Sequence, residues 1–591
     1  MKKIGHVLKK ADWKLAAVLM ISLAMLIFYG NQKEGYHVDE VYSYGLANSE
    51  YLPFMHFGQH DYNVKEWMAE YGAGESPGQL FGNLIRDFRI LKECGFHLKE
   101  SVIYQDYLTA QASSADTRTT GWVPGQAYMD YLAVSESNAF NYASVYYNQR
   151  GDVHPPLYYG LLHTICSVFR GKFSRWFGLG LNFAALLMAA VLLYKMCRLY
   201  LGGRRTALLT AGVYSLSAGF LSTAMFLRMY ALLTFMVMAC CYMHLKIADE
   251  DFRLKGKNRR KLVLVVLCGF LTHYYFVLYA IGVALVFCIW MAVKRKWREM
   301  AGYVLTLAGT AAAGLCIWPF AIRHVFHGYR GVGSLETLLG GDFYLSKTKL
   351  MFDQAAAWIL GGHGWGLLLC LCVSVGLLVR KRGRDLPVFK GLLLFAPIVF
   401  YTVTVSQIVP FLDTRYIMCT YPFWYLAVFG TAEVLLRECL RKTADNSYIK
   451  TGVLAAVGAL LLGVSCGGWN TPDHLYPGGQ ETVEIAENTD FVFILPDGDW
   501  NQSAVDSTIL AQCRNVGVTY LSDMGRLAED YEYQAGDVLI IAVQQDMDVE
   551  AVLAQAKKEF GVEDLAEIGR DMGSTSVRVK LAGRDETGSW D

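Results

Sequence analysis

Two short motifs carry side chains that could move protons next to a membrane. The first is the acidic pair Asp39-Glu40, set in the sequence GYHVDEVYS just after the first apolar stretch. The second combines Asp152 with His154 in GDVHPPLYY, just before the next apolar stretch. A carboxylate at such a position can act as a general base toward a hydroxyl or an amine, or it can hold a divalent ion. The combination favours an enzyme active site at the membrane surface over a passive channel.

Each motif also has a simpler interpretation. An acidic pair at the end of a membrane helix is most often a solvated boundary, and a histidine before two prolines often marks only the start of a helix. Aromatic and histidine neighbours make this acidic pair unlike a lysine-rich solvated edge. We expect Asp39 to be the base and Glu40 to orient the acceptor. Asp152, His154 and Asp39 could form a metal-binding or a proton-handling group, a choice that spacing leaves open.

Two arginines interrupt apolar sequence farther along the chain. Arg228 lies in STAMFLRMYAL, just before Tyr230, and Arg415 opens a later apolar run in DTRY. His273 and Tyr274 lie near the end of another span. Either arginine could simply snorkel to the interface, and an aromatic belt explains tyrosines but not the histidine. Together, the arginines suit a phosphate, which guanidinium binds in bidentate fashion.

An arginine-bound lipid phosphate and a carboxylate base describe glycosyl transfer from a polyprenyl-phosphate sugar, with the lipid tail in a groove between helices. The donor-binding residues expected from this chemistry are Arg228, Arg415, Tyr230, His273 and Tyr274.

Apolar blocks long enough to cross a bilayer dominate the 591 residues, of which 54% are hydrophobic. The basic segment 1–14 precedes an apolar run over 15–30 with no small-residue cleavage site, which indicates a retained signal anchor. A net charge of +1, without a basic domain, gives no case for nucleic acid. The further predicted spans are 157–170, 176–197, 206–222, 230–246, two within 261–293, 299–320, 364–380, 386–410, 416–438 and 450–466.

Basic clusters after residue 198 mark the cytoplasmic helix ends and alternate consistently. They predict a multi-pass protein of the cell membrane with about 11 to 13 transmembrane helices. A long first loop over 31–156, the segment 321–362 and the C-terminal region would be extracytoplasmic. The predicted topology is inconsistent at one place. His154 is expected outside and Arg198 inside, so an odd number of spans must separate them, but two apolar runs lie between them. We expect 157–170 to be re-entrant or interfacial, unless the signal for the inner face is wrong there.

The sequence pattern of the last part of the chain is typical of a small α/β domain. Short apolar runs predict strands at 491–495, 518–521, 537–542 and 576–580, and helical patterns occupy 504–515, 524–531 and 549–560. This alternation predicts a mainly parallel sheet. No glycine-rich phosphate motif is present. We divide the chain into a membrane domain, 1–475, and an extracytoplasmic domain, 476–591, which is expected to be structural or to guide the acceptor.

In these motifs the chain resembles the GT-C glycosyltransferases, specifically the bacterial family-39-like group that includes protein O-mannosyltransferases and the enzymes attaching aminoarabinose to lipid A. The matching residues span about 15–440 and are Asp39-Glu40, HPPLYY at 154–159, RMYAL at 228–232, HYY at 273–275 and Arg415-Tyr416. The resemblance implies an inverting, extracytoplasmic transfer from an isoprenoid-phosphate-linked sugar. It implies Asp39 as the base or a metal-side carboxylate, Glu40 as an aid to acceptor placement, and a donor phosphate near Arg228 or Arg415. A divalent metal is left open as a cofactor, with Asp39 and His154 as ligands. The acceptor, whether protein, lipid or cell-envelope glycan, is unspecified.

Two other classes of protein use the same residue types. A transporter or flippase for a lipid-linked or anionic substrate would use the arginines and carboxylates as translocation sites. Repeated halves and broken midplane helices, which are typical of transporters, are not evident in the sequence. A sensor or assembly scaffold would use the α/β tail as its binding module.

Overall fold

The computed structural model describes most of the chain and groups it into two compact units. The first consists of Met1–Asn31, Leu80–Tyr104 and Gly178–Asp473, and the second of Gln32–Gln79, Gln105–Phe177 and His474–Asp591. The described residues are 12–54, 120–326, 344–365, 387–409, 411–439, 447–465, 472–476, 489–497, 506–531, 538–544, 547–571, 574–581 and the isolated positions 85, 86, 89, 92, 93, 331, 333, 334 and 337.

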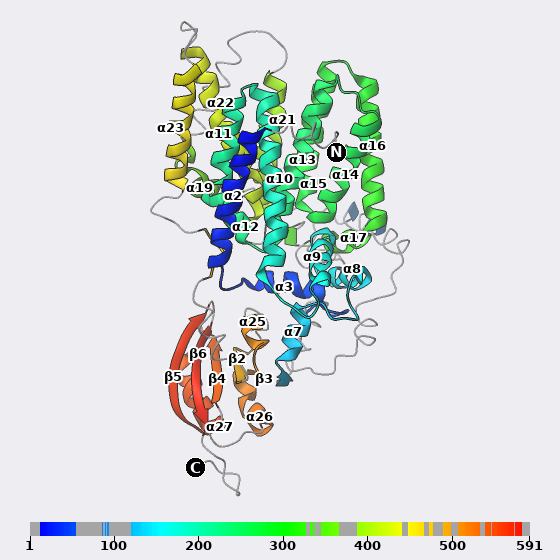
Figure 1. The fold of residues 1–591 in the computed structure, drawn as a ribbon. Coiled ribbons are helices and arrows are strands. Elements are labelled where there is room, and N and C mark those ends of the chain that lie inside the picture. Colours follow the sequence, from blue (N-terminus) through cyan, green and yellow to red (C-terminus); the bar gives the residue numbers. More distant parts are fainter. Residues whose placement is uncertain are drawn as a thin grey trace, which may run out of the picture. The chain divides into compact units, whose positions relative to one another are not determined.

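Long apolar helices run side by side in the first unit (Figure 1). Seven helices within the described residues are long and apolar enough to cross a membrane, or eight if one bent pair counts as a span. The chain is therefore a multi-pass membrane protein. The seven are α2 (Trp13–Gln32), α10 (Arg175–Leu201), α13 (Tyr230–Asp249), α15 (Tyr275–Val293), α16 (Trp297–Ile317), α21 (Pro387–Ile408) and α23 (Ser447–Ser465).

Breaks between helices follow local signals in the sequence. The bent pair is α11 (Arg204–Ser215) and α12 (Ala218–Met225), which meet at 51° where Ser217 caps α12. The predicted division of 261–293 is confirmed by α14 (Gly256–Thr272) and α15, separated at His273 and Tyr274. The remaining elements of this unit are α17 (Phe320–Phe326), the 3-10 helix η3 (Thr414–Thr420) and α22 (Tyr421–Cys439).

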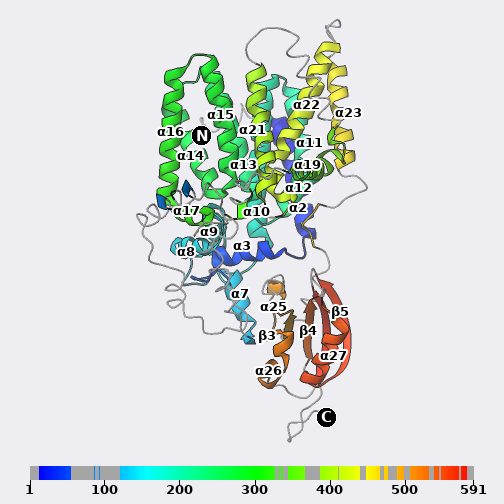
Figure 2. The same ribbon diagram turned by 180° about the vertical axis from the view of Figure 1, so that it is seen from behind.

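A 16-residue helix of this unit was not predicted. The helix α19 (Leu345–Leu360) lies in sequence that was expected to form an outer connection. Helix α19 buries Met351, Ala355 and Ile359. It packs against α21, α22 and α23, and Figure 2 shows these helices from behind. The predicted span 364–380 falls almost wholly outside the described residues.

Among its described residues, the second unit contains four helices that precede α10 in the sequence. They are α3 (Val38–Asn48), α7 (Gln126–Leu132), α8 (Tyr142–Gly151) and α9 (Leu157–Val168). The 12 residues of α9 extend about 18 Å, too little for a hydrocarbon core of about 30 Å. Because α9 packs on α3 and α8, the run 157–170 is a short helix of this unit and not a full span. This supports the re-entrant or interfacial interpretation.

A six-stranded sheet, in the order β1-β3-β2-β4-β6-β5, completes the second unit. Only the central β3-β2-β4 pairings are parallel, and the other three are antiparallel, so the prediction of a mainly parallel sheet is wrong. The strands are β1 (Gly121–Pro124), β2 (Asp490–Leu495), β3 (Asn515–Tyr520), β4 (Val538–Gln544), β5 (Val562–Asp571) and β6 (Ser574–Leu581); the helices are α25 (Ser507–Leu510), η5 (Leu521–Asp523), α26 (Met524–Glu529) and α27 (Val549–Phe560).

Strand β1 comes from the first loop, not from the C-terminal sequence. It pairs antiparallel with β3, with Trp122 opposite Gly517. Helix α7 follows it directly and inserts Tyr128 into the core on one face of the sheet, beside Leu510 of α25. The structure thus joins the loop and the tail in one unit, a different division from the expected boundary at 475.

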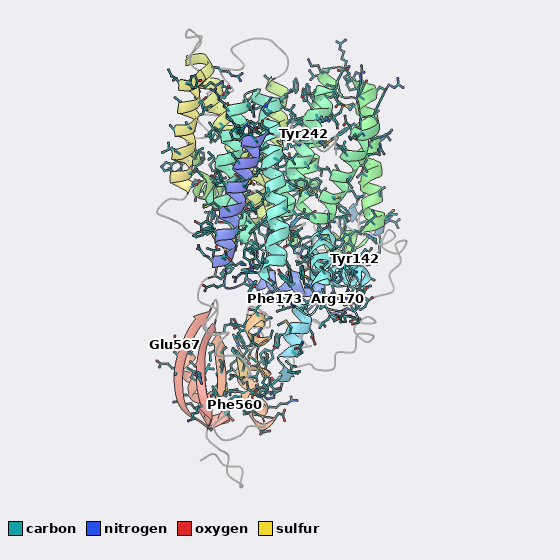
Figure 3. All side chains as sticks on the ribbon, in the orientation of Figure 1. Tyr142, Arg170, Phe173, Tyr242, Phe560 and Glu567 are labelled. Atoms are coloured by element: carbon teal, nitrogen blue, oxygen red, sulfur yellow. The ribbon has the colours of Figure 1, made fainter. Side chains whose placement is uncertain are left out.

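Alternation along the strands builds a core on each face of the sheet. Val492 and Ile494 of β2 face one side, and Phe491 and Phe493 face the other. Helices α26 and α27 cover the first side, where Phe560 is fully buried (Figure 3).

Candidate functional site

The acidic motif forms the first turn of α3, which starts with a capping box. His37 is the N-cap, and its Nδ1 accepts a hydrogen bond of 3.1 Å from the Asp39 backbone N–H. Glu40 Oε2 accepts one of 2.7 Å from the His37 backbone N–H. These two bonds satisfy donors that a helix start leaves without partners, and acidic side chains there also suit the helix dipole. Residues 37–40 therefore specify where α3 begins.

The two acidic side chains differ in their access to solutes. The Asp39 side chain is 17% exposed, and its Oδ2 lies 3.8 Å from His37 Nδ1. The Glu40 side chain is completely buried. The expectation that Glu40 contacts the acceptor is therefore corrected, because a side chain without exposed surface cannot touch one. Asp39 is the carboxylate of this pair that a substrate can reach.

Glu40 instead pairs with Lys33, a residue that the sequence analysis missed. Lys33 Nζ lies 3.0 Å from Glu40 Oε2, and neither side chain is exposed. The ring of Tyr36 covers the ammonium. Burial raises the pKa of Tyr36 well above its ordinary value, Arg175 opposes this shift and Glu40 adds to it, so this phenol stays neutral. A lysine just after an apolar helix is usually a snorkelling residue, so its position in the chain carries little signal.

Asp152 and His154 form a directly bonded pair between α8 and α9. Asp152 Oδ2 lies 2.7 Å from His154 Nδ1, and both side chains are largely buried. A carboxylate at Nδ1 fixes the orientation of an imidazole and can stabilise its protonated form. Two prolines follow, and Pro156 is the N-cap of α9. The predicted His154–Asp152 association is present in the structure.

Tyr131 of α7 lies against α3 and feels the charge of Asp152. Its hydroxyl donates to the Pro53 carbonyl at 2.9 Å, and its ring lies against Gly45. Burial, and then the neighbouring Tyr42 and Asp152, raise the pKa of Tyr131 well above its ordinary value. Helices α7, α8 and α9 all contact α3.

A metal site is not supported by these residues. Within the part of the chain that the structure describes, no three His, Cys, Asp or Glu side chains are grouped closely enough to hold a metal ion. Asp39 and His154 therefore belong to no such group within the described residues.

The arginine motifs of the first unit meet at an aromatic cluster. Tyr230, two residues after Arg228, has its ring 5.8 Å from that of His273 and 6.3 Å from that of Tyr416. Tyr416 directly follows Arg415, whose guanidinium lies over its ring at 5.2 Å. The structure thus brings three of the predicted donor motifs together.

Both arginines are buried within that unit. Arg228 is 3% exposed and sits at the break between α12 and α13. Arg415 is 6% exposed, and its Nε lies 3.3 Å from Asp413 Oδ2. Buried guanidinium groups among aromatic rings are a chemically suitable environment for a phosphate.

Tyr274 does not share the ring contacts of its neighbour His273. Its hydroxyl lies 2.7 Å from His324 Nδ1 and accepts a bond of 2.8 Å from the Trp318 indole N–H. These contacts join the start of α15, the end of α16 and α17, so they support Tyr274 as a packing residue. Neither His324 nor Trp318 was identified from the sequence.

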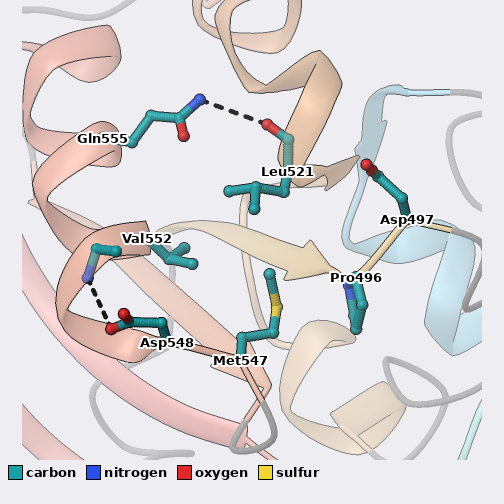
Figure 4. Close-up of a pocket in the computed structure, with 8 residues that line it drawn as sticks. Pro496, Asp497, Leu521, Met547, Asp548, Val552 and Gln555 are labelled. Carbon is teal, nitrogen blue, oxygen red and sulfur yellow. Dashed lines mark hydrogen bonds between the residues drawn. The ribbon is translucent and has the colours of Figure 1, made fainter.

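A separate pocket of about 310 Å³ lies where the parallel strands β2, β3 and β4 end (Figure 4). One oxygen of Asp497 accepts from Ser522 Oγ at 3.0 Å, and one of Asp548 caps α27. None of its eight lining residues is basic, which disfavours a phosphate ligand.

Comparison with known proteins gives structural likeness alone. No family model matches the chain, and no curated protein matches it. Its structure is similar to that of ArnT from Cupriavidus metallidurans in the apo state, with 12% identity and a TM-score of 0.43, covering 80% of this chain and 97% of the other. It is also similar to an oligosaccharyltransferase from Archaeoglobus fulgidus in complex with zinc and sulfate, with 12% identity and a TM-score of 0.38. That match covers 72% of this chain and 64% of the other, so the chain spans less than two thirds of that protein.

Proposed function

We propose that this protein is a membrane glycosyltransferase that moves a sugar from a polyprenyl-phosphate donor to an extracytoplasmic acceptor. The observation that carries the proposal is the first turn of α3, where a solvent-accessible carboxylate, Asp39, is fixed by a capped backbone. The aromatic cluster that joins the Arg228 and Arg415 motifs supports it with a setting suited to a lipid phosphate.

The proposed reaction is a single inverting displacement at the anomeric carbon. Asp39 accepts the proton of an acceptor hydroxyl or amine as the acceptor atom attacks that carbon. The bond from the anomeric carbon to the phosphate oxygen breaks, and polyprenyl phosphate leaves with the electron pair. Arg228 and Arg415 would neutralise the phosphate charge that develops. His154, oriented by Asp152, is assigned to the acceptor side.

The test uses the full-length protein in nanodiscs with a panel of labelled polyprenyl-phosphate sugars and candidate acceptors. Release of free polyprenyl phosphate is followed for wild type and Asp39→Asn. We expect Asp39→Asn to lower kcat by about 10²–10⁴-fold with little change in donor binding. The matched control is Asp130→Asn, which neutralises an exposed carboxylate on α7. Near-full turnover by Asp39→Asn would show that another group is the base.

Donor binding is tested separately through Arg415. Removing a buried guanidinium that binds a phosphate should cost about 1.5–3 kcal/mol, so Arg415→Ala should weaken donor binding by about 10- to 150-fold. The control is Arg205→Ala, since Arg205 is exposed and bonds to Thr451. Unchanged donor affinity in Arg415→Ala would remove that residue from the site. If wild type binds no donor, transbilayer movement of lipid-linked sugars would be measured to test a flippase.

A further inference from the structure

The buried partners of Lys33 come from two distant parts of the chain. Its Nζ lies 3.0 Å from Glu40 Oε2 and donates to the His474 carbonyl at 2.6 Å. The rings of Tyr36 and Tyr476 have their centroids 5.3 and 5.0 Å from Nζ. Lys33 and Glu40 are both fully buried. Because a buried charge is costly unless it is paired, each residue depends on the other.

Glu40 transmits this pairing to the start of α3. The same Oε2 atom that meets Lys33 accepts the His37 backbone N–H. Asp39 is the preceding residue, about 100° around the helix, and its own backbone N–H is bonded to the His37 side chain. A change in the position of Glu40 therefore moves the turn that aims the Asp39 carboxylate.

Residues 474–476 are fixed against the same segment by backbone bonds. Glu34 N–H donates to the Leu475 carbonyl and Gly35 N–H to the Tyr476 carbonyl, both at 2.9 Å. His474 and Tyr476 have φ of +67° and +48°, a left-handed conformation that persists in non-glycine residues only where the surroundings hold it. A Cβ on Gly35 would lie 2.8 Å from Tyr476 Cβ, so the approach requires glycine.

We propose that Lys33 and Glu40 are positioning residues that fix Asp39 against residues 474–476, the segment that leads into the C-terminal strands. The role of Glu40 is thus to hold the catalytic turn and not to touch substrate. The inference rests on the proposed transferase function, because its readout is the turnover that Asp39 supports.

The test compares Lys33→Met, Glu40→Gln and the double variant in the full-length protein. Glutamine keeps an oxygen for the His37 N–H but removes the charge, so Glu40→Gln leaves the Lys33 ammonium buried without its counter-charge. Lys33→Met leaves Glu40 in the same condition. The double variant removes both charges at nearly constant volume, a replacement that is often tolerated. Donor release gives kcat and KM, and thermal unfolding reports folding.

Each single variant should lower kcat by about 10²-fold with an unchanged donor KM, since a small misplacement of a reacting group has an effect of that size. The double variant should return to within about tenfold of wild type. The matched control is Glu433→Gln, which disrupts a buried glutamate paired with Lys450 among the membrane helices. It should lower the unfolding temperature without a selective loss of kcat.

Three results would overturn the proposal. Wild-type kcat in Glu40→Gln would show that the pair positions nothing. A folded double variant as inactive as Glu40→Gln would show that the carboxylate itself acts on substrate. An equal loss of kcat in folded Glu433→Gln would show a general response to lost stability. A wild-type protein that transfers no sugar from any donor would instead overturn the proposed function, which keeps the two failures distinct. If the single variants do not fold, the double variant alone still decides.

Discussion

Replacing Gly45 by alanine tests how closely α3 packs on its support. Gly45 lies in the middle of α3, and a Cβ built on it would be 1.9 Å from Cζ and 2.3 Å from Oη of Tyr131. Ordinary carbon contacts are about 3.5–4.0 Å, so the ring or the helix must move by more than 1 Å. Tyr131 is 2% exposed and bonded to Pro53, which leaves the ring little room.

The expected effect is the difference between two opposing terms. Glycine to alanine within a helix stabilises by about 1 kcal/mol through propensity. Overpacking a filled core costs about 1–3 kcal/mol, and loss of the Tyr131–Pro53 hydrogen bond adds about 1 kcal/mol. Gly45→Ala should therefore destabilise the protein by about 1–3 kcal/mol. It should also lower turnover, because α3 carries Asp39.

Gly160→Ala is the matched control, since Gly160 lies within α9 and a Cβ there would meet no atom within 4 Å. Thermal unfolding in nanodiscs should rank Gly160→Ala at or above wild type and Gly45→Ala below it. Adding Tyr131→Leu to Gly45→Ala removes the atoms that clash and should restore part of the loss. If Gly45→Ala were as stable as Gly160→Ala, the packing of α3 on Tyr131 would be refuted.

Two more predictions concern the sheet. Burial alone would raise the pKa of Asp490, but hydrogen bonds from Arg514 and Tyr531 hold it below its ordinary value of 3.8. A carboxyl with a lowered folded pKa stabilises above its unfolded pKa and loses that contribution as pH falls through the folded pKa. Asp490→Asn should thus cost about 1–3 kcal/mol at pH 7, and the difference from wild type should shrink below about pH 3.8; equal differences in unfolding temperature at pH 7 and pH 3 would contradict this. Trp122 stacks on Tyr531 and donates to the Leu527 carbonyl at 3.0 Å. Trp122→Phe should cost about 1 kcal/mol for the bond, and Trp122→Ala about 3 kcal/mol with the packing, as chemical denaturation would measure; equal losses would show that the ring contributes nothing.

Apolar helices, which make their backbone hydrogen bonds within the helix, were the most predictable part of the fold. Hydropathy alone located α13 and α15, because a run of apolar residues long enough to span a bilayer has few other options. The same criterion missed α19, whose lysines at 347 and 349 break the apolar run although its other face is buried. Charged residues on one face lower the mean hydropathy of a helix, although its other face still packs against its neighbours.

The sheet was less predictable because its pairing depends on distant sequence. The apolar runs of β2 and β4 were recognised locally. Strand β1 has only four residues, and nothing near it in the chain indicates its partner β3. The antiparallel arrangement of β5 and β6 depends likewise on contacts that periodicity does not report.

At the candidate site, the sequence located the acidic pair and assigned the base to Asp39, but it did not indicate that Glu40 is buried. The difference between the two carboxylates depends on Lys33 and on the carbonyl of His474, 441 residues away from that lysine. The sequence therefore predicted where a base could lie, and the folded chain adds that Asp39 is partly exposed whereas Glu40 is buried against Lys33.

The pairing of β1 with β3 also imposes an order on biosynthesis. Thr120 and Thr519, at the ends of these strands, are 399 residues apart in sequence. At about 5–20 residues per second, a ribosome needs roughly 20–80 s between them. Throughout that interval Trp122 and Val123 lack the strand β3 with which they pair. A chain released before residue 515 lacks the strand that pairs with β1 and therefore cannot complete the sheet.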